Sequence, residues 1–360
     1  MLSNKLKSMP TLNTFSESRD NNFNLIRFGA ALGVFFSHCF PLAGFGYQGK
    51  EYLLGFVCLN VFFIVSGYLV TKSYMDCKNI KQFFWSRILR IFPALFLAVL
   101  YSTFIIGLLF TTLPLDQYLS NLQVYLYFVK NIALLVPDIP SYLPGVFESN
   151  IYNSEVNSPL WSLPYEVFFY IVIGLLAYVS SAKKNIRAFS ITISLLLLIC
   201  YAIFVTNYST RAADFALPFN KEGYRLASFF LLGVVFYLFR SKIVLSHWIM
   251  LSLYVLIGIS TFYHFIFVAV TYCVLVYTIF YLAYIPAGRL RSFNRLGDYS
   301  YGIYIFGYPT QQAISTAYEL PFFIYCVVTF LITLTLAVLS WHWVEKRALS
   351  YKNLHSSKSG

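Results

Sequence analysis

Residues 24–41, NLIRFGAALGVFFSHCFP, form an apolar stretch long enough to cross a membrane, yet they include Arg27 near the start and His38 near the end. The separation corresponds to about three turns of α-helix and roughly 16 Å of rise, so both side chains share one helix face. An ionisable side chain in a bilayer is costly unless it faces protein or water. The pattern predicts a polar path inside a helix bundle, or else Arg27 extends to the headgroups and His38 is a core residue.

The composition is typical of a polytopic membrane protein. Of 360 residues, 59% are hydrophobic and 11% charged, and the mean hydropathy is +0.67, whereas soluble domains carry about 25% charged residues. The net charge of +12 is divided among short basic clusters between apolar runs, which indicates membrane topology. We therefore expect the lipid bilayer as a partner and no nucleic acid. The six cysteines lack metal-ligand spacing, so we expect no metal site.

The apolar runs predict an all-α fold, a polytopic membrane bundle of about ten transmembrane helices with both termini cytoplasmic. This topology follows the positive-inside rule, because every Lys and Arg then lies on the cytoplasmic side except Arg27 in the first span and Lys50, Lys130, Arg211, Lys221 and Arg225 outside. The predicted spans are 23–41, 52–71, 91–111, 159–180, 186–206, 222–239, 244–260, 263–285, 297–316 and 321–343.

The chain divides into a polar cytoplasmic tail at 1–22, a transmembrane domain at 23–346 and a basic cytoplasmic tail at 347–360. The only long loop of this topology is an outer segment at 111–158. Its first part, 115–136, is apolar but interrupted by polar side chains. We expect that part to be an amphipathic helix lying on, or dipping into, the outer face.

Glu166 is the only acidic residue deep in a predicted span. The predicted orientation places it toward the outer end of the fourth span, and His38 toward the outer end of the first. A histidine paired with a carboxylate suits the general base that activates a hydroxyl. The sequence therefore predicts His38 and Glu166 as a catalytic pair.

Two further motifs each allow two interpretations. Arg87 and Arg90 are three residues apart and share a helix face at the cytoplasmic boundary. Their guanidinium groups suit phosphate oxygens, although basic anchors are also common at this boundary. The pair Ser66-Gly67 in the second span is either a close-packing contact between helices or part of a site.

Several motifs occur in an order that resembles the acyltransferase-3 family of integral membrane acyltransferases, from Asn24 to about Lys346. YPTQQ at 308–312 makes the exopolysaccharide and O-antigen O-acetyltransferase branch the closer match. Many members have a histidine near position 307, where this chain has Gly307, so no role is carried over to that position. The motifs are Arg27-x10-His38, FFIVSGYLV at 62–70, RILR at 87–90, the stretch 143–170 with Trp161 and Glu166, LGDYSYGIYIF at 296–306 and WVEKRAL at 343–349.

The resemblance implies that 23–346 is an acyltransferase domain in the bacterial cytoplasmic (inner) membrane. It would transfer an acyl group, commonly acetyl, from cytoplasmic acyl-CoA to a hydroxyl of a surface polysaccharide or lipid-linked oligosaccharide. Acyl-CoA is then a substrate, and we expect no permanently bound cofactor. A transporter or flippase without covalent chemistry is the alternative, because polar groups also line transport paths. The implied catalytic residues are His38 and Glu166, and the implied substrate-binding residues are Arg27, Arg87, Arg90, Ser66 and Trp161.

Overall fold

The computed structural model describes residues 10–18, 20–45, 50–134, 139–210, 221–262 and 264–353. Parts of the predicted tails (1–9 and 354–360), residues 135–138 of the predicted outer segment, Arg19 and Arg211 lie outside the described residues. The chain folds as two compact units. The first comprises Met1–Arg27, Asn60–Asp76 and Val172–Leu296; the second comprises Phe28–Leu59, Cys77–Ile171 and Gly297–Gly360.

The predicted all-α class is confirmed, and helices lie in all ten predicted spans. Among the described residues, seven helices are long and apolar enough to cross a membrane: Phe23–Leu42, Leu53–Asp76, Ile80–Phe110, Ser158–Val179, Ile186–Thr206, Ile266–Tyr284 and Phe322–Ser350. The other three predicted spans correspond to α11 (Lys221–Leu238), α12 (His247–Ser260) and α14 (Ser300–Ala317). The number of ten spans and the orientation of the termini stay predictions.

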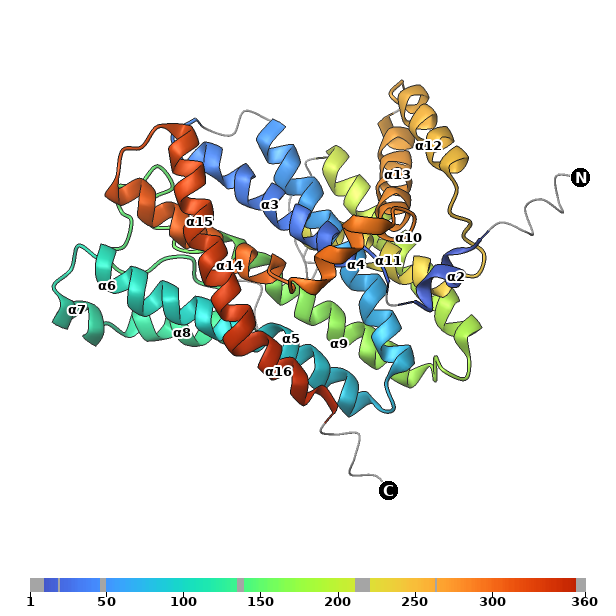
Figure 1. Ribbon diagram of the computed structural model, residues 1–360, viewed down its shortest axis with the longest axis horizontal. Helices are drawn as coiled ribbons and strands as arrows, with labels where there is room; N and C mark the ends of the chain where they lie inside the picture. The colour runs from blue at the N-terminus through green and yellow to red at the C-terminus, as the bar shows by residue number, and fades with distance from the viewer. Residues whose placement is uncertain are drawn as a thin grey trace, which may run out of the picture. The chain divides into compact units, whose positions relative to one another are not determined.

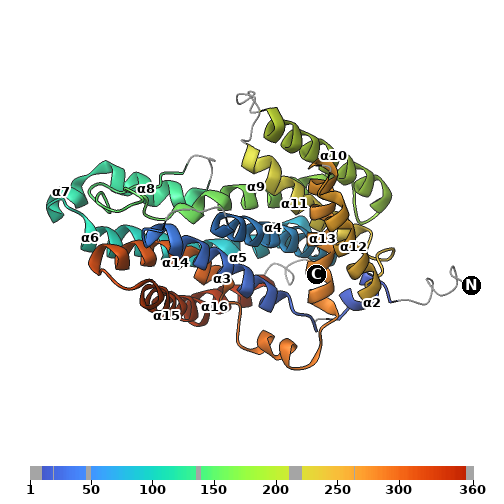
Figure 2. The same cartoon turned by 90° about the horizontal axis from the view of Figure 1, so that it is seen from above.

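The first unit contains α10 (Ile186–Thr210), α11, α12 and α13 (His264–Tyr284), together with the part of α4 (Lys50–Asp76) that belongs to it. Figures 1 and 2 both show α12 and α13 side by side. Its core is aromatic: the Tyr68 ring lies 4.6 Å from that of Phe280 and 5.4 Å from that of Tyr237, measured between centroids. Such ring pairs stabilise a core beyond the area they bury.

A close approach of α4 and α11 depends on two glycines. A Cβ on Gly67 would lie 2.0 Å from the carbonyl oxygen of Phe230, and a Cβ on Gly233 would lie 2.0 Å from that of Ile64. Small residues let helix backbones approach in membranes. The packing interpretation of the Ser66-Gly67 pair is therefore confirmed for Gly67.

The second half of the N-terminal tail is folded onto the first unit. Its short helix α2 (Leu12–Ser16) has Leu12 completely buried. The Leu12 amide donates to the carbonyl of Ile243 at 2.7 Å, and the Lys72 ammonium donates to the Ser16 carbonyl at 2.5 Å. The buried Leu12 side chain and these hydrogen bonds hold a segment that the sequence predicts to be a polar tail.

The second unit is built around α14, which packs between α5 (Ile80–Leu100) and α15 (Phe322–Ser340) (Figure 1). The Tyr301 hydroxyl donates to the Ile91 carbonyl at 3.1 Å, and nine residues later Thr310 contacts Tyr101 at 3.2 Å between hydroxyl oxygens. Ile91 of α5 and Tyr101, which directly follows α5, meet Tyr301 and Thr310 in the same chain order, so α5 and α14 run in the same direction. Residues 300–313 of α14 are all buried.

The predicted amphipathic segment forms two short helices, α7 (Leu115–Ser120) and α8 (Leu122–Ala133). The Asn121 side chain between them accepts from the Gln123 amide at 2.9 Å and so caps α8. In α8, Val124, Tyr127 and Asn131 are buried on one face. With 12 residues, α8 is too short to span a bilayer, as the amphipathic pattern predicts.

Long apolar side chains are exposed along several described helices. They include Leu195, Leu198 and Ile199 on α10, Leu251, Val255 and Ile259 on α12, and Phe323, Val327 and Leu331 on α15. Exposed apolar surface of this extent marks a lipid-facing or interacting surface. Together with the seven membrane-length helices, it makes the chain an integral membrane protein.

Candidate active site

A ladder of polar side chains follows one face of α14 through the second unit. Tyr301, Tyr304 and Tyr308 are spaced three and four residues apart, so they share a helix face, and Gln312 continues it. All four are buried. Each hydroxyl is hydrogen-bonded: that of Tyr301 to Ile91, that of Tyr304 to Pro159 and Ser162, and that of Tyr308 to Glu155. We call these four residues the tyrosine ladder.

At the N-terminal end of α14, Arg90 of α5 forms an ion pair with Asp298. The side chain of Arg90 is 17% exposed and that of Asp298 is 8% exposed. The second oxygen of Asp298 accepts a 2.5 Å hydrogen bond from Ser300, so Asp298 binds these side chains rather than capping the helix. Glu345, buried after the end of α15, also acts electrostatically on Arg90. Arg90 is thus neutralised within the fold.

Arg87 lies one turn before Arg90 and is half-buried. Its guanidinium lies over the ring of Tyr170, 5.7 Å from the centroid, and donates to the Ser86 hydroxyl at 3.3 Å. The Tyr170 hydroxyl donates to the carboxylate of Glu166, whose charge also acts on Arg87. Glu166 of α9 (Leu163–Val179) therefore belongs to the arginine end of the ladder.

His38 lies at the other end of the ladder. Its imidazole meets the ring of Tyr308 at 87°, with 5.3 Å between centroids. The hydroxyl of Tyr308 donates to the Glu155 carboxylate at 2.9 Å. The described structure shows no hydrogen bond between His38 and Glu166, and their assignment as a catalytic pair stays a prediction. Glu155 is the carboxylate on the His38 side, and Tyr308 stands between them.

The outer segment is fastened to α14 beside His38. Pro309 has no N–H and so leaves the carbonyl of Ile305 without its helical donor; the side chain of Asn157 supplies one at 2.9 Å. The Gln312 amide donates to the carbonyls of Tyr152 and Glu155 at 2.9 and 2.8 Å. α14 therefore continues through Pro309, and Glu155 is held close to Tyr308.

Two buried acceptor atoms flank the Tyr308 turn. The Gln311 amide donates to the Phe35 carbonyl at 2.9 Å and to the Cys39 sulfur at 3.1 Å, both on α3 (Phe23–Leu42). Its Oε1 atom, and the Oδ1 atom of Asn157, are buried without a hydrogen-bond partner among the described residues. Buried polar atoms are normally paired, so these oxygens are candidates to accept hydrogen bonds from a ligand.

The predicted site residues divide between the units. Arg27 on α3 and Ser66 on α4 belong to the first unit, and both are half-buried. Trp161 belongs to the second unit, where its ring meets that of Tyr165 with centroids 5.9 Å apart. The remaining four, His38, Arg87, Arg90 and Glu166, lie along the tyrosine ladder of the second unit as described above. The described residues contain no group of three or more His, Cys, Asp or Glu placed to hold a metal.

The tyrosine ladder and Glu155 did not emerge from the sequence. The ladder has a detectable signal, because Tyr301, Tyr304, Tyr308 and Gln312 recur with helical spacing inside a predicted span. Glu155 has no such signal in the sequence, because it is one of several acidic residues in the outer segment, and only the fold brings it to α14.

An integral membrane helical bundle that gathers half-buried arginines, carboxylates and a histidine around one buried helix belongs to the class of membrane proteins that act on polar groups within the bilayer. The chain is a member of the acyltransferase-3 family, whose model, described as an acyltransferase domain, matches residues 20–342. It is therefore an integral membrane acyltransferase, which decides against the alternative of a transporter without covalent chemistry.

The chain is 27% identical to a protein named O-acetyl transferase from Shigella phage Sf6, over 92% of this chain and 97% of the relative. It is 30% identical to Nodulation protein 10 of Rhizobium leguminosarum bv. viciae, over 51% of each chain. It is 26% identical to the putative peptidoglycan O-acetyltransferase YrhL of Bacillus subtilis, over 81% of this chain and 50% of that protein. No solved structure matches the chain.

Proposed function

We propose that the protein transfers an acetyl group from cytoplasmic acyl-CoA to a hydroxyl of a surface polysaccharide or its lipid-linked precursor, in the bacterial cytoplasmic membrane. The observation that carries this proposal is the tyrosine ladder, with arginines at one end and His38 with the outer segment at the other. The names of the Shigella phage and Bacillus relatives support O-acetylation.

The arginine end is the proposed donor site. Arg90 forms an ion pair with Asp298. Arg87 lies over the ring of Tyr170, donates to the Ser86 hydroxyl and is also acted on by the charge of Glu166. We assign Arg87 to a CoA phosphate and give Arg90 the task of holding α5 against the start of α14. Glu166, with Tyr170, orients Arg87 in this proposal.

The His38 end is the proposed acceptor site. Polysaccharides present hydroxyl donors, and Oε1 of Gln311 and Oδ1 of Asn157 are acceptors without a partner. From Tyr301, beside the arginine end, to Tyr308 the rise along α14 is about 10 Å. An acyl-CoA bound by its phosphates at Arg87 would extend its arm along the ladder to bring the thioester to His38.

Two routes fit this geometry. As a general base, His38 takes the proton of the acceptor hydroxyl; the oxygen then bonds to the thioester carbon, the C–S bond breaks, and the CoA thiolate takes the proton. As a nucleophile, the unprotonated His38 nitrogen first bonds to the acyl carbon, the C–S bond breaks, and the CoA thiolate takes the proton of the other ring nitrogen. The acceptor hydroxyl then bonds to the acyl carbon and displaces the imidazole, to which the hydroxyl proton returns. In both routes the Glu155 carboxylate acts through Tyr308 on the position of His38.

The test uses the purified full-length protein, acetyl-CoA and a candidate glycan, with acceptor-dependent release of CoA as the readout. Loss of acid–base assistance typically costs about 10²–10⁴-fold in rate, so His38→Ala should lose that much and still bind acetyl-CoA. The control is His247→Ala, whose imidazole is bonded to Tyr281 on the first unit. Full activity of a folded His38→Ala protein would contradict the proposal.

The two routes differ in the absence of acceptor. Rapid quench with radiolabelled acetyl-CoA should leave label on the wild-type protein, and not on His38→Ala, if an acyl-imidazole forms; no label on either favours the general base. Donor binding is tested by Arg87→Ala. One charge-assisted hydrogen bond is worth about 1.5–3 kcal/mol, so the KM for acetyl-CoA should rise about tenfold or more, with partial rescue by Arg87→Lys.

A further inference from the structure

A short 3-10 helix, η3 (Gly288–Arg295), follows α13 in the first unit and separates its residues into three faces. A 3-10 helix has three residues per turn, so side chains three apart are aligned. Leu290, Phe293 and the following Leu296 form an apolar face, whereas Arg289, Ser292 and Arg295 form a polar one.

The third face of η3 is already used. Arg291 forms an ion pair with Asp20 and donates to the Tyr284 carbonyl at 2.7 Å. Asn294 donates to the Asn21 carbonyl at 2.5 Å. These bonds fix η3 against the N-terminal segment and leave the apolar face outside: Leu290 is 49% exposed and Leu296 is 55% exposed.

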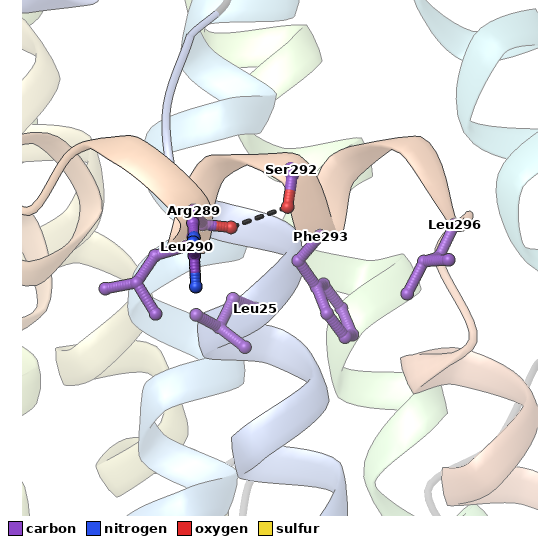
Figure 3. Close-up of a pocket in the computed structure, with 6 residues that line it drawn as sticks. All are labelled: Leu25, Arg289, Leu290, Ser292, Phe293 and Leu296. Carbon is purple, nitrogen blue, oxygen red and sulfur yellow. Dashed lines mark hydrogen bonds between the residues drawn. The ribbon is translucent and has the colours of Figure 1, made fainter.

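A surface pocket of about 250 Å³ lies beneath this face. Leu25 of α3 forms its other wall, and Figure 3 shows the side chains of Leu290, Phe293 and Arg289 extending from η3 toward it. Ser292 lies at the edge, where its hydroxyl donates to the Arg289 carbonyl at 2.6 Å. The pocket therefore has apolar walls and one cationic side chain.

Arg289 differs from Arg291 in its surroundings. Its guanidinium makes no hydrogen bond or ion pair with the residues that the structure describes, and it is exposed. In Figure 3 its charged end lies beside Leu25. An arginine without an anion, beside exposed apolar side chains in a membrane protein, is complementary to a phosphate that carries an acyl chain.

We propose that this pocket binds an anionic phospholipid of the cytoplasmic leaflet, with its phosphate on Arg289 and the start of an acyl chain against Leu25, Leu290 and Phe293. η3 lies in a loop that the positive-inside rule places in the cytoplasm, where anionic headgroups attract basic residues. The volume also favours a chain segment, because pockets that enclose small molecules measure about 300–1,000 Å³. A nucleotide such as CoA would not be enclosed.

The test measures lipid retained by the purified full-length protein. Protein in detergent is mixed with phosphatidylglycerol or phosphatidylcholine, and the bound lipid is measured by native mass spectrometry over a concentration series. We expect preferential retention of phosphatidylglycerol and about tenfold weaker binding by Arg289→Ala, the loss typical of one charge-assisted hydrogen bond. Leu290→Ser should also weaken retention, since it removes an exposed apolar wall.

Arg295→Ala is the matched control. It removes the same charge from the same face of η3, two turns from Arg289, and Arg295 does not line the pocket. It should retain phosphatidylglycerol as the wild type does. If Arg289→Ala and Arg295→Ala lost phosphatidylglycerol binding equally, the binding would be general charge attraction and the proposal would be overturned. Displacement of the lipid by CoA, or equal retention of both lipids, would overturn it as well.

Discussion

The hydroxyl of Tyr308 donates a 2.9 Å hydrogen bond to the carboxylate of Glu155. The ring of the same tyrosine contacts the imidazole of His38, and the two ring planes are nearly perpendicular. The Gln312 amide holds the backbone of Glu155 at 2.8 Å. A carboxylate from the outer segment is thereby fixed next to the proposed base, through a tyrosine that belongs to α14.

Removal of this hydrogen bond should impair acyl transfer without affecting donor binding. A hydrogen bond to a charged group contributes about 1.5–3 kcal/mol, so Tyr308→Phe should lower kcat about tenfold or more and leave the KM for acetyl-CoA unchanged. Glu155→Gln should likewise lower kcat and leave the KM for acetyl-CoA unchanged. Steady-state kinetics with the purified protein measures both kcat and the KM for acetyl-CoA. Tyr118→Phe is the control, because that buried hydroxyl donates to the neutral carbonyl of Thr103 at 2.8 Å; a comparable loss there would indicate a general effect on stability.

The Arg90–Asp298 ion pair should contribute to stability. Removal of one partner from a buried pair leaves an uncompensated charge and costs about 3–5 kcal/mol. Arg90→Ala and Asp298→Ala should therefore each lower the thermal unfolding midpoint in detergent, and the double variant should lose less than the sum of the two. Strict additivity would show that the two side chains do not interact.

Gly67→Ala should destabilise the first unit. The new methyl group would meet the Phe230 carbonyl oxygen at 2.0 Å, and overpacking typically costs about 1–3 kcal/mol. Gly258→Ala is the matched control, because a Cβ at Gly258 meets nothing within 4 Å. The thermal unfolding midpoint of Gly67→Ala should be lower than that of Gly258→Ala. Equal midpoints would mean that α4 and α11 do not cross at Gly67.

The predicted topology places the loop before α5 inside and the outer segment outside. Lys78 and Ser149 are both exposed, so cysteines introduced at these positions are accessible to a membrane-impermeant maleimide. Lys78→Cys should react only after the membrane is opened, and Ser149→Cys should react in intact cells. The chain without an introduced cysteine gives the background. Reaction of both from one side would contradict the orientation assigned to every site residue.

The sequence determined the helices and their membrane setting. In hydrocarbon, backbone N–H and C=O groups must be paired within the segment, so long apolar runs can only form helices. This is why helices lie in all ten predicted spans. The amphipathic pattern predicted one helix over 115–136, where the structure has two, α7 and α8, and α8 has one buried face. The positions of His38, Arg87 and Glu166 on their helices also followed from the sequence.

Only the tertiary structure decided which of these groups meet. Helical periodicity fixes the face of a side chain, but its partner depends on how helices distant in sequence pack together. Arg90 binds Asp298, 208 residues away, and Glu166 turns to Tyr170 rather than to His38. Glu155 reaches Tyr308 because Pro309 frees the carbonyl of Ile305, to which Asn157 of the outer segment binds. A carboxylate in a loop has no periodicity that reveals its partner, so the hydrogen bond between Glu155 and Tyr308 is a product of packing alone.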